Sequence, residues 1–273
     1  MARPNVRLAP LTTLSPMPVD HFPSTHATWI DAQLTIIDEA DRAHVEGHPS
    51  AAPRADAARD ALRRHVMDRY TAALSAYVAS SGLRSAGERD ELVAGFYAGP
   101  MSDAAFFSRW RQSGMPLRRW LMNAIAFHCR SIRRDALRER ARSDPGDVRS
   151  LDAVGALGGP GAAAAAEADA ADAFDRAWAL AIVNDAYARV QAELADAGRD
   201  HDDAILRMHL IDGMPYDEIA RQLGLTRTDC FNATRRVAAR VRGALRELLQ
   251  EEGVPNSGLD AAVAEVMRLV ERG

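Results

Sequence analysis

Arginine is the side chain best placed to do chemistry in this sequence, and it is concentrated between Thr226 and Arg246. Six Arg and one Asp fall in that stretch, a local charge of about +5. Guanidinium groups bind phosphate oxygens and the edge of guanine through paired hydrogen bonds, so the stretch has the composition of a nucleic-acid-binding surface. Helical spacing places these side chains on its outward face: Arg227, Thr228, Phe231, Asn232, Arg235 and Arg236.

Two helices joined by a tight turn are predicted to hold this face, over residues 214–242. Pro215 stands where a helix begins, because the first turn of a helix does not need its N–H group. Ile219 and Leu223 lie four residues apart and form one apolar stripe. Gly224 follows and suits the left-handed conformation that ends a helix. The pattern predicts a helix-turn-helix, the motif that lays its second helix in the DNA major groove.

The second helix of the motif has its own start signal. Thr226 and Asp229 fit a capping box, with Asp229 in the place of the usual Glu or Gln. The side chains expected to face inward are Cys230, Thr234, Val237 and Val241. The plain alternative is an amphipathic hairpin whose arginines are only solvated. The capped start and the glycine at the bend favour DNA binding.

Composition excludes several classes of protein. The 273 residues are 47% apolar and carry a net charge of −4, so nothing global demands a nucleic-acid partner. Periods near 3.6 recur and alternating strand patterns are missing, which predicts an all-α fold. Cys129 and Cys230 lack zinc-ligand spacing and are expected to be small buried side chains. We expect no metal, cofactor or catalytic residue, and, without a signal peptide or membrane span, a cytoplasmic, nucleoid-associated protein.

Charge falls in blocks along the chain. Residues 104–143 contain ten Arg against Asp135 and Glu139, whereas residues 144–175 contain seven acidic residues against Arg149. This order, basic block, acidic spacer, second basic block, indicates two DNA-binding modules joined by a linker.

The first basic block interleaves its arginines with aromatic residues: Phe106, Phe107, Trp110, Trp120 and Phe127. Rings for bases to stack on, beside guanidinium groups, are typical of a surface for single-stranded nucleic acid. The alternative is that these rings belong to the core. The expected core face of this helix carries Leu121, Ile125, His128/Cys129 and Ile132. The polar side chains expected mainly off that face are Arg118, Arg119, Asn123, Arg130, Arg133 and Arg134.

Helical periods and breaks predict two helical domains joined by a flexible acidic Ala/Gly-rich linker. The expected helices span about 26–45, 56–80, 87–98, 103–112, 117–141, 202–211 and 259–271, with a long one starting near Ala173. The expected divisions are a flexible tail over 1–21, a domain over 22–142, the linker over 143–172, a helix-turn-helix domain over 173–252, and a helical extension over 253–273. The extension is expected either to dock as a built-in regulator or to be a terminal cap.

Together these features resemble the extracytoplasmic-function class of bacterial RNA polymerase sigma factors, in the sigma-70 family, which keeps sigma domains two and four. The segment MPYDEIARQLGLTRTDCFNATRRVAARVR is similar to domain four, with Thr226 in place of Ser and Cys230 in place of Val. The matching positions are Gly213, Tyr216, Glu218, Ile219, Ala220, Leu223, Gly224, Arg236, Arg240 and Leu245.

Two further segments resemble domain two. LRRWLMNAIAFHCRSIRRDALRER is similar to the helix that melts the minus-ten element, through Trp120, Leu121, Ile125, Ala126 and Arg133, with His128 in the place of Asn. RDELVAGFYAG is similar to the polymerase-binding helix, through Glu91, Leu92, Val93 and Phe96, with Ala94 in the place of Gln.

The resemblance implies a promoter-specificity subunit that is not itself an enzyme. Its implied partners are promoter DNA and core RNA polymerase, at the clamp of the beta-prime subunit and the beta flap; no anti-sigma partner can be named. The polymerase-binding residues would be Glu91, Leu92, Val93, Phe96 and Tyr97. The minus-ten residues would be Arg118, Arg119, Trp120, Asn123, Phe127, His128, Arg130, Arg133 and Arg134. In the minus-thirty-five element, Asn232 would hydrogen-bond adenine, Arg235 would hydrogen-bond guanine, and Phe231 would contact a thymine methyl group. The residues implied to bind phosphates are Arg227, Arg236 and Arg240.

Three alternatives stay open on the sequence. One is a stand-alone helix-turn-helix regulator that binds operators, disfavoured because no ligand pocket is evident. Another is a helical protein that binds polymerase without promoter activity, which the substitutions at Ala94 and His128 keep open. A helical enzyme is least favoured, because His65, His128 and Glu218 have no recognisable catalytic spacing.

Overall fold

The computed structural model describes residues 28–46, 48, 52–143, 160–252 and 254–272, and all regular secondary structure in these ranges is helical. The predicted all-α class is therefore confirmed for the described part of the chain. The expected tail over 1–21, and residues 144–159 of the expected linker, lie outside it.

The N-terminal part is a cluster of helices. They are α1 (Thr28–Val45), α2 (Ala52–Ser80), α3 (Arg89–Ala98), α4 (Phe106–Ser113) and α5 (Leu117–Ser143), with short 3-10 turns η2 (Gly82–Ala86) and η3 (Pro100–Ser102). The bounds follow the predicted ones within a few residues. In α2 an apolar stripe that steps by four residues is buried: Leu62, Val66, Tyr70, Leu74 and Val78.

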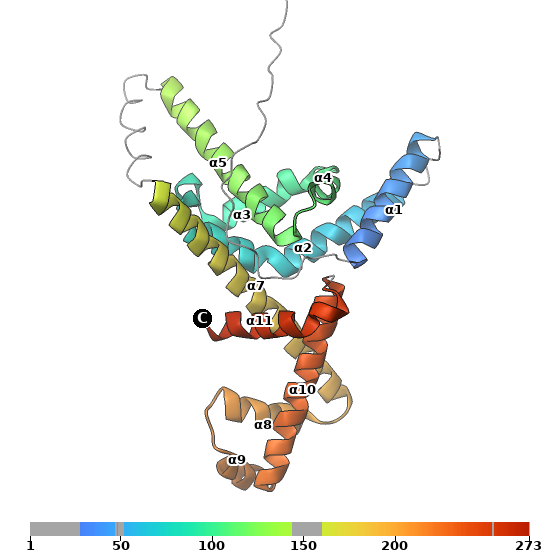
Figure 1. The fold of residues 1–273 in the computed structure, drawn as a ribbon, viewed down its shortest axis with the longest axis vertical. Helices are drawn as coiled ribbons and strands as arrows, with labels where there is room; N and C mark the ends of the chain where they lie inside the picture. Colours follow the sequence, from blue (N-terminus) through green and yellow to red (C-terminus); the bar gives the residue numbers. More distant parts are fainter. Residues whose placement is uncertain (1–27, 47, 49–51, 144–159, 253, 273) are drawn as a thin grey trace, which may run out of the picture.

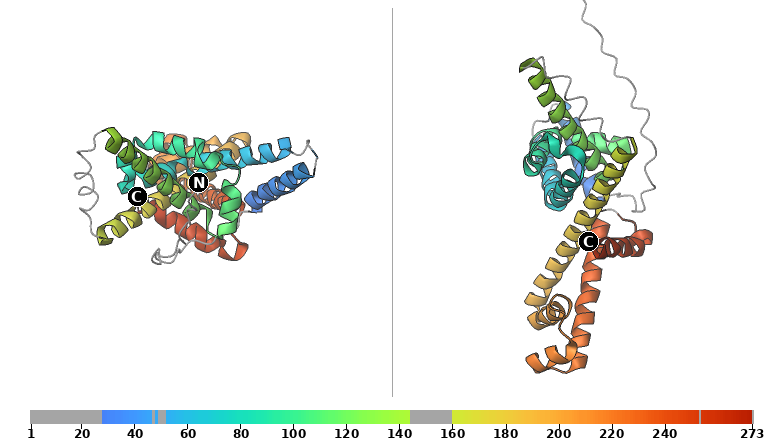
Figure 2. Two further views of the ribbon diagram at one scale, coloured as in Figure 1. Left: turned by 90° about the horizontal axis from the view of Figure 1, so that it is seen from above. Right: turned by 90° about the vertical axis from the view of Figure 1, so that its left-hand side faces the viewer.

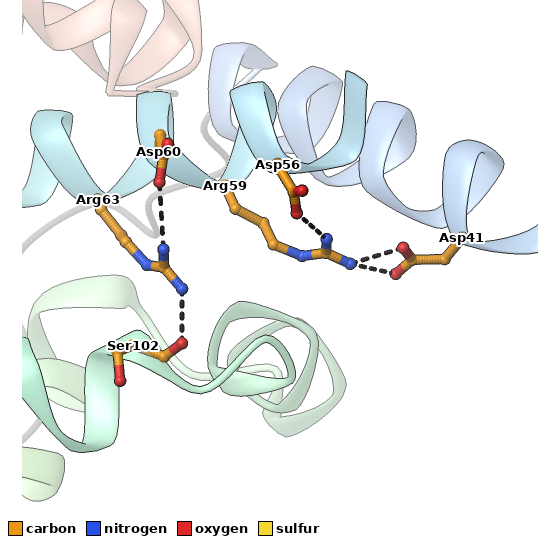
Figure 3. Close-up of polar contacts among 6 residues, drawn as sticks. All are labelled: Asp41, Asp56, Arg59, Asp60, Arg63 and Ser102. Atoms are coloured by element: carbon orange, nitrogen blue, oxygen red, sulfur yellow. Dashed lines mark hydrogen bonds and ion pairs between the residues drawn. The ribbon is translucent and has the colours of Figure 1, made fainter. Parts of the chain in front are cut away.

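Polar contacts hold the start of α2 against its neighbours (Figure 3). Arg59 donates to both carboxylate oxygens of Asp41 on α1, at 2.6 Å each, and to Asp56 at 3.0 Å. One turn further along, Arg63 donates to the backbone carbonyl of Ser102 in η3 at 2.5 Å. Two arginines of α2 thus fix α1 on one side and the α3–α4 connection on another.

Helix α7 (Pro160–Asp196) runs from the N-terminal cluster toward the C-terminal helices (Figure 1). It begins 13 residues before the predicted start near Ala173, so residues 160–172 of the expected linker are helical. Ala170 and Phe174 are fully buried, and the Phe174 ring lies 6.3 Å from that of Tyr70 on α2. Alanine has the highest helix propensity, and packing against α2 stabilises the helix across a stretch whose glycines and acids predicted a linker.

The C-terminal helices are α8 (Asp200–Leu210), α9 (Tyr216–Leu223), α10 (Arg227–Glu251) and α11 (Leu259–Glu271), with a 3-10 turn η4 (Asn256–Gly258) before the last. Helix α10 lies beside α7, and α11 crosses both (Figure 1). The side chains that α11 buries in this packing include Leu259, Ala262, Val263, Val266 and Leu269. The C-terminal extension is therefore docked on the chain.

One apolar core joins the two expected domains. It runs through Leu62 of α2, Phe96 of α3, Phe174 of α7, Leu245 of α10 and Val266 of α11. The boundary expected between residues 172 and 173 falls inside a helix, and the described residues on its two sides share this core.

The molecule is elongated. The N-terminal cluster with α5 lies at one end and the α8–α9–α10 unit at the other, in two perpendicular views (Figures 1 and 2). Among the described helices none is both long and apolar enough to cross a membrane.

Candidate nucleic-acid interface

The turn between α9 and α10 has the backbone geometry of a helix-turn-helix. Pro215 is the N-cap of α9, one position before the first helical residue. Gly224 ends the helix in the left-handed region, with φ 66° and ψ 28°. The backbone N–H of Leu225 then donates to the Ala220 carbonyl at 3.0 Å, which closes the turn.

The predicted capping box is present at the start of α10. Thr226 Oγ1 accepts a hydrogen bond from the Asp229 backbone N–H at 3.1 Å, and an Asp229 carboxylate oxygen accepts one from the Thr226 N–H at 3.2 Å. The hydrogen bonds from the Thr226 side chain and backbone lower the pKa of Asp229. The first turn of α10 is thus fixed by its own sequence.

A small core behind the turn orients α10. Its buried members are Ile205, Ile219, Ala220, Cys230 and Ala233. Of the residues predicted to face inward, Cys230 and Val237 are buried, whereas Thr234 and Val241 are half-buried. Burial of this stripe turns the opposite face of α10 outward.

The outward face of α10, which we call the recognition face, consists of seven exposed residues: Arg227, Thr228, Phe231, Asn232, Arg235, Arg236 and Arg240. Phe231 is 46% exposed and is supported from behind by Tyr216, whose ring meets it edge-on at 5.9 Å. The guanidinium of Arg235 lies over the Phe231 ring, 5.8 Å from its centroid. This is a cation–π arrangement, with both groups open to solvent.

The arginines of the recognition face differ in their partners. Arg236 lies 3.3 Å from Asp202, a buried carboxylate on α8, and Arg227 lies 3.8 Å from the exposed Asp217. Within the described ranges Arg235 and Arg240 have no ion-pair partner. Exposed guanidiniums without a carboxylate are free to bind phosphate or a base edge.

Arg118 is not on the surface, contrary to the expectation that it contacts DNA. It is 5% exposed and forms an ion pair with Asp175 on α7 at 3.2 Å. This ion-pair partner lies 57 positions away in the chain, so no local sequence pattern indicated the contact. Arg118 therefore holds the two helices together.

The aromatic residues of the first basic block divide into core and surface. Phe106, Phe107 and Trp110 are buried, so for these three the core alternative is correct. Trp120 is half-buried, with its ring 5.8 Å from that of Phe106. Only Phe127 is largely exposed, at 64%.

His128 lies half-buried on α5 against α3. Its ring centroid is 6.2 Å from that of Phe96, and burial lowers its pKa. Its Nε2 atom and the Trp120 Nε1 atom are buried without a hydrogen-bond partner in the described structure. Along the same helix Leu121, Ile125 and Cys129 are fully buried, as predicted.

The exposed part of α5 forms a basic strip around Phe127. Its exposed members include Asn123, Phe127, Arg130, Arg133 and Arg134, and Arg119 is half-buried. The Arg134 guanidinium lies 5.8 Å from the Phe127 ring centroid, while Arg130 lies 3.8 Å from Glu167 of α7.

The expected polymerase-binding residues on α3 are mostly in the core. Leu92, Val93 and Phe96 are at most 3% exposed, which corrects the prediction that they form a docking face. Their apolar character reflects packing against α2 and α5. Glu91 is exposed, and Tyr97 is half-buried, with its hydroxyl 2.8 Å from that of Thr71.

Two further features were not predicted from the sequence. One is a buried polar cluster around Glu252, whose only sequence signal is its spacing of four from the buried Leu248. The other is a cavity between α7, α8, α10 and α11. The described residues contain no group of three or more His, Cys, Asp or Glu side chains placed to hold a metal ion.

Comparisons of the chain with models of protein families, with curated proteins and with solved structures find no match.

Proposed function

We propose that this chain binds duplex DNA with the recognition face of α10 in the major groove, and that it is a promoter-recognition subunit of bacterial RNA polymerase. The observation that carries the proposal is the capped helix-turn-helix whose seven predicted contact residues are all exposed. The polymerase-level role rests on the sequence resemblance to sigma factors.

The side chains at the centre of the recognition face are the ones suited to contact base edges. Asn232 can form paired hydrogen bonds with adenine and Arg235 with guanine, and Phe231 can contact a thymine methyl. Arg227 and Arg240 suit the flanking phosphates. Arg236, held by Asp202 on α8, is a phosphate contact whose direction is fixed in advance.

The basic strip on α5 is the proposed second DNA contact. Phe127 offers an exposed ring for an unstacked base, and Arg133 and Arg134 offer charge for its backbone. The elongated shape supports this division, because the two surfaces lie at opposite ends of the molecule (Figure 2). Two separated DNA elements are what a promoter presents. On α3, Glu91 and the edge of Tyr97 are the proposed polymerase contacts that remain accessible.

A second candidate function is a stand-alone regulator that binds operator DNA. It is favoured by the shared core, because this core contains Val237 and Leu245 of α10 and so connects the helix-turn-helix, through α10, to the N-terminal cluster. Such a protein binds duplex DNA tightly without polymerase.

Run-off transcription with core polymerase and a library of genomic fragments tests the proposal. Transcripts that depend on the added protein, and that change their promoter preference with Arg235→Ala, are the expected result. The control is Arg221→Ala, an exposed arginine of α9 outside the recognition face. Specific duplex binding by the protein alone, with no dependent transcript, contradicts the polymerase role and establishes the regulator.

A further inference from the structure

A cavity of about 340 Å³ lies where α7, α8, α10 and α11 meet. This volume is within the range of protein sites that bind small molecules, and the junction of several helices is a common place for them. The cavity lies outside the recognition face and the basic strip, so the proposed DNA contacts do not use it.

The wall of the cavity is mainly aliphatic. It includes Val183 of α7, Leu206 of α8, Val241 and Leu245 of α10, and Val263 of α11. Leu210 and Ile211 also line it and are themselves 66% and 71% exposed, so the apolar surface continues outward. An aliphatic chain gains free energy by leaving water for such a wall.

The charged groups of the lining are all positive. Arg207 of α8 and Arg242 of α10 line the cavity, and no Asp or Glu does. Both arginines are exposed and lack an ion-pair partner among the described residues.

Asp203 of α8 lies beside the lining residue Tyr187 and is held by hydrogen bonds. Asp203 accepts hydrogen bonds from the Tyr187 hydroxyl at 2.5 Å and from Gln191 at 3.1 Å. Burial, and then the hydrogen bond and charge of Asp203, raise the pKa of Tyr187 to about 12, so this lining residue stays neutral at physiological pH. Arg207 and Arg242, which form no ion pair among the described residues, can bind an anion from solution.

We propose that this cavity binds a small amphipathic anion, an aliphatic carboxylate whose chain lies on the apolar wall and whose head group lies between Arg207 and Arg242. The site stands apart from the proposed DNA-binding function. Its aliphatic wall and its two lining guanidiniums define the class of ligand by shape and charge.

Calorimetric titration of the full chain with decanoate, without DNA, tests the site. We expect saturable binding of one decanoate per chain, and weaker binding of decanol and of decyltrimethylammonium. Arg207→Ala and Arg242→Ala should each weaken decanoate binding by roughly fivefold, because an exposed ion pair contributes little more. Arg221→Ala should leave the affinity unchanged.

A bulky substitution that fills the cavity tests whether decanoate binds there or elsewhere on the protein. Ala238 and Ala239 are neighbouring exposed residues of α10, and of the two only Ala238 lines the cavity. Ala238→Trp should weaken decanoate binding at least about tenfold, whereas Ala239→Trp should not. The proposal is overturned if decanoate shows no saturable binding, if decanol binds as tightly, or if Ala238→Trp leaves the affinity unchanged.

Discussion

The hydroxyl of Tyr70 donates a hydrogen bond to the carboxylate of Glu252 over 2.9 Å, although 182 positions separate the two residues. Both side chains are buried. Arg69 and His65 lie 3.4 Å and 3.3 Å from the same carboxylate, so residues of α2 surround a charge at the end of α10. This cluster joins the N-terminal helices to the C-terminal ones.

Replacing Glu252 with Gln should destabilise the protein strongly. The change removes the buried partner of Arg69 and leaves it only Asp185, a half-exposed carboxylate 3.5 Å away. Breaking a buried ion pair from one side costs about 3 kcal/mol, and an exposed partner compensates for little of that. The free energy of unfolding, measured by urea denaturation, should fall by about that amount. The matched control is Glu251→Gln, which removes an exposed pair with Arg189 at 3.0 Å and should cost less than about 1 kcal/mol. Equal losses for the two variants contradict a stabilising role of the cluster.

The same carboxylate predicts how stability depends on pH. Burial by itself raises the pKa of Glu252, but the neighbouring His65, the charge of Arg69 and the hydrogen bond from Tyr70 outweigh it, and the pKa is lowered from its ordinary value of 4.5. A lowered carboxyl pKa contributes stability that is fully present above the unfolded value and is lost as pH falls through the folded value. The stability difference between wild type and Glu252→Gln should therefore shrink as the pH of the urea titrations falls below about 4.5. A difference that stays constant in this range contradicts the charge as its cause.

Arg235 and Arg240 should affect DNA binding in different ways. Arg235→Ala should relax the preference at one base pair, at a cost of about 1–3 kcal/mol, because it removes a base contact. Arg240→Ala should weaken binding to all sequences alike and reduce its salt dependence, because it removes a phosphate contact. Competition binding over randomised duplexes at several salt concentrations measures both effects. A uniform loss for Arg235→Ala refutes base reading.

Alanine substitutions at Phe127 and Phe106, both in the first basic block, should have different effects: the first on promoter opening and the second on the free energy of unfolding. Phe127→Ala should change the free energy of unfolding by less than about 0.5 kcal/mol, because the ring is 64% exposed. It should lower promoter opening, measured as permanganate reactivity of unpaired thymines. Phe106→Ala removes a buried ring and should cost about 3–5 kcal/mol in stability. If promoter opening by the Phe127→Ala variant is unchanged, the Phe127 ring is not part of the DNA contact.

Replacing two glycines of the C-terminal part with alanine should change the stability of the protein in opposite directions. Gly224 has φ 66°, and a Cβ there meets nothing within 4 Å, so only the backbone opposes the change. Gly224→Ala should destabilise by about 1 kcal/mol. Gly243 lies inside α10 with the same open space, and Gly243→Ala should stabilise by about 0.5–1 kcal/mol. Thermal denaturation of both variants gives the signs, and a destabilised Gly243→Ala contradicts the open space around that position.

The sequence by itself determined the local elements of this protein. The turn at Gly224, the capping box of Thr226 and Asp229, and the outward face of α10 are all as predicted. Each depends on residues a few positions apart, where dihedral preferences and helical periodicity suffice. The same holds for the buried stripe of α2.

The tertiary structure decided what covers each helix face. Arg118 and Phe96 lie on helices predicted correctly, yet both are buried. Arg118 pairs with Asp175 of α7, and the Phe96 ring packs near Phe106 of α4 and His128 of α5. No local pattern encodes such distant partners. The early start of α7, the Tyr70–Glu252 contact and the cavity beside Arg207 arise in the same way. Each exists only when segments far apart in the chain pack together.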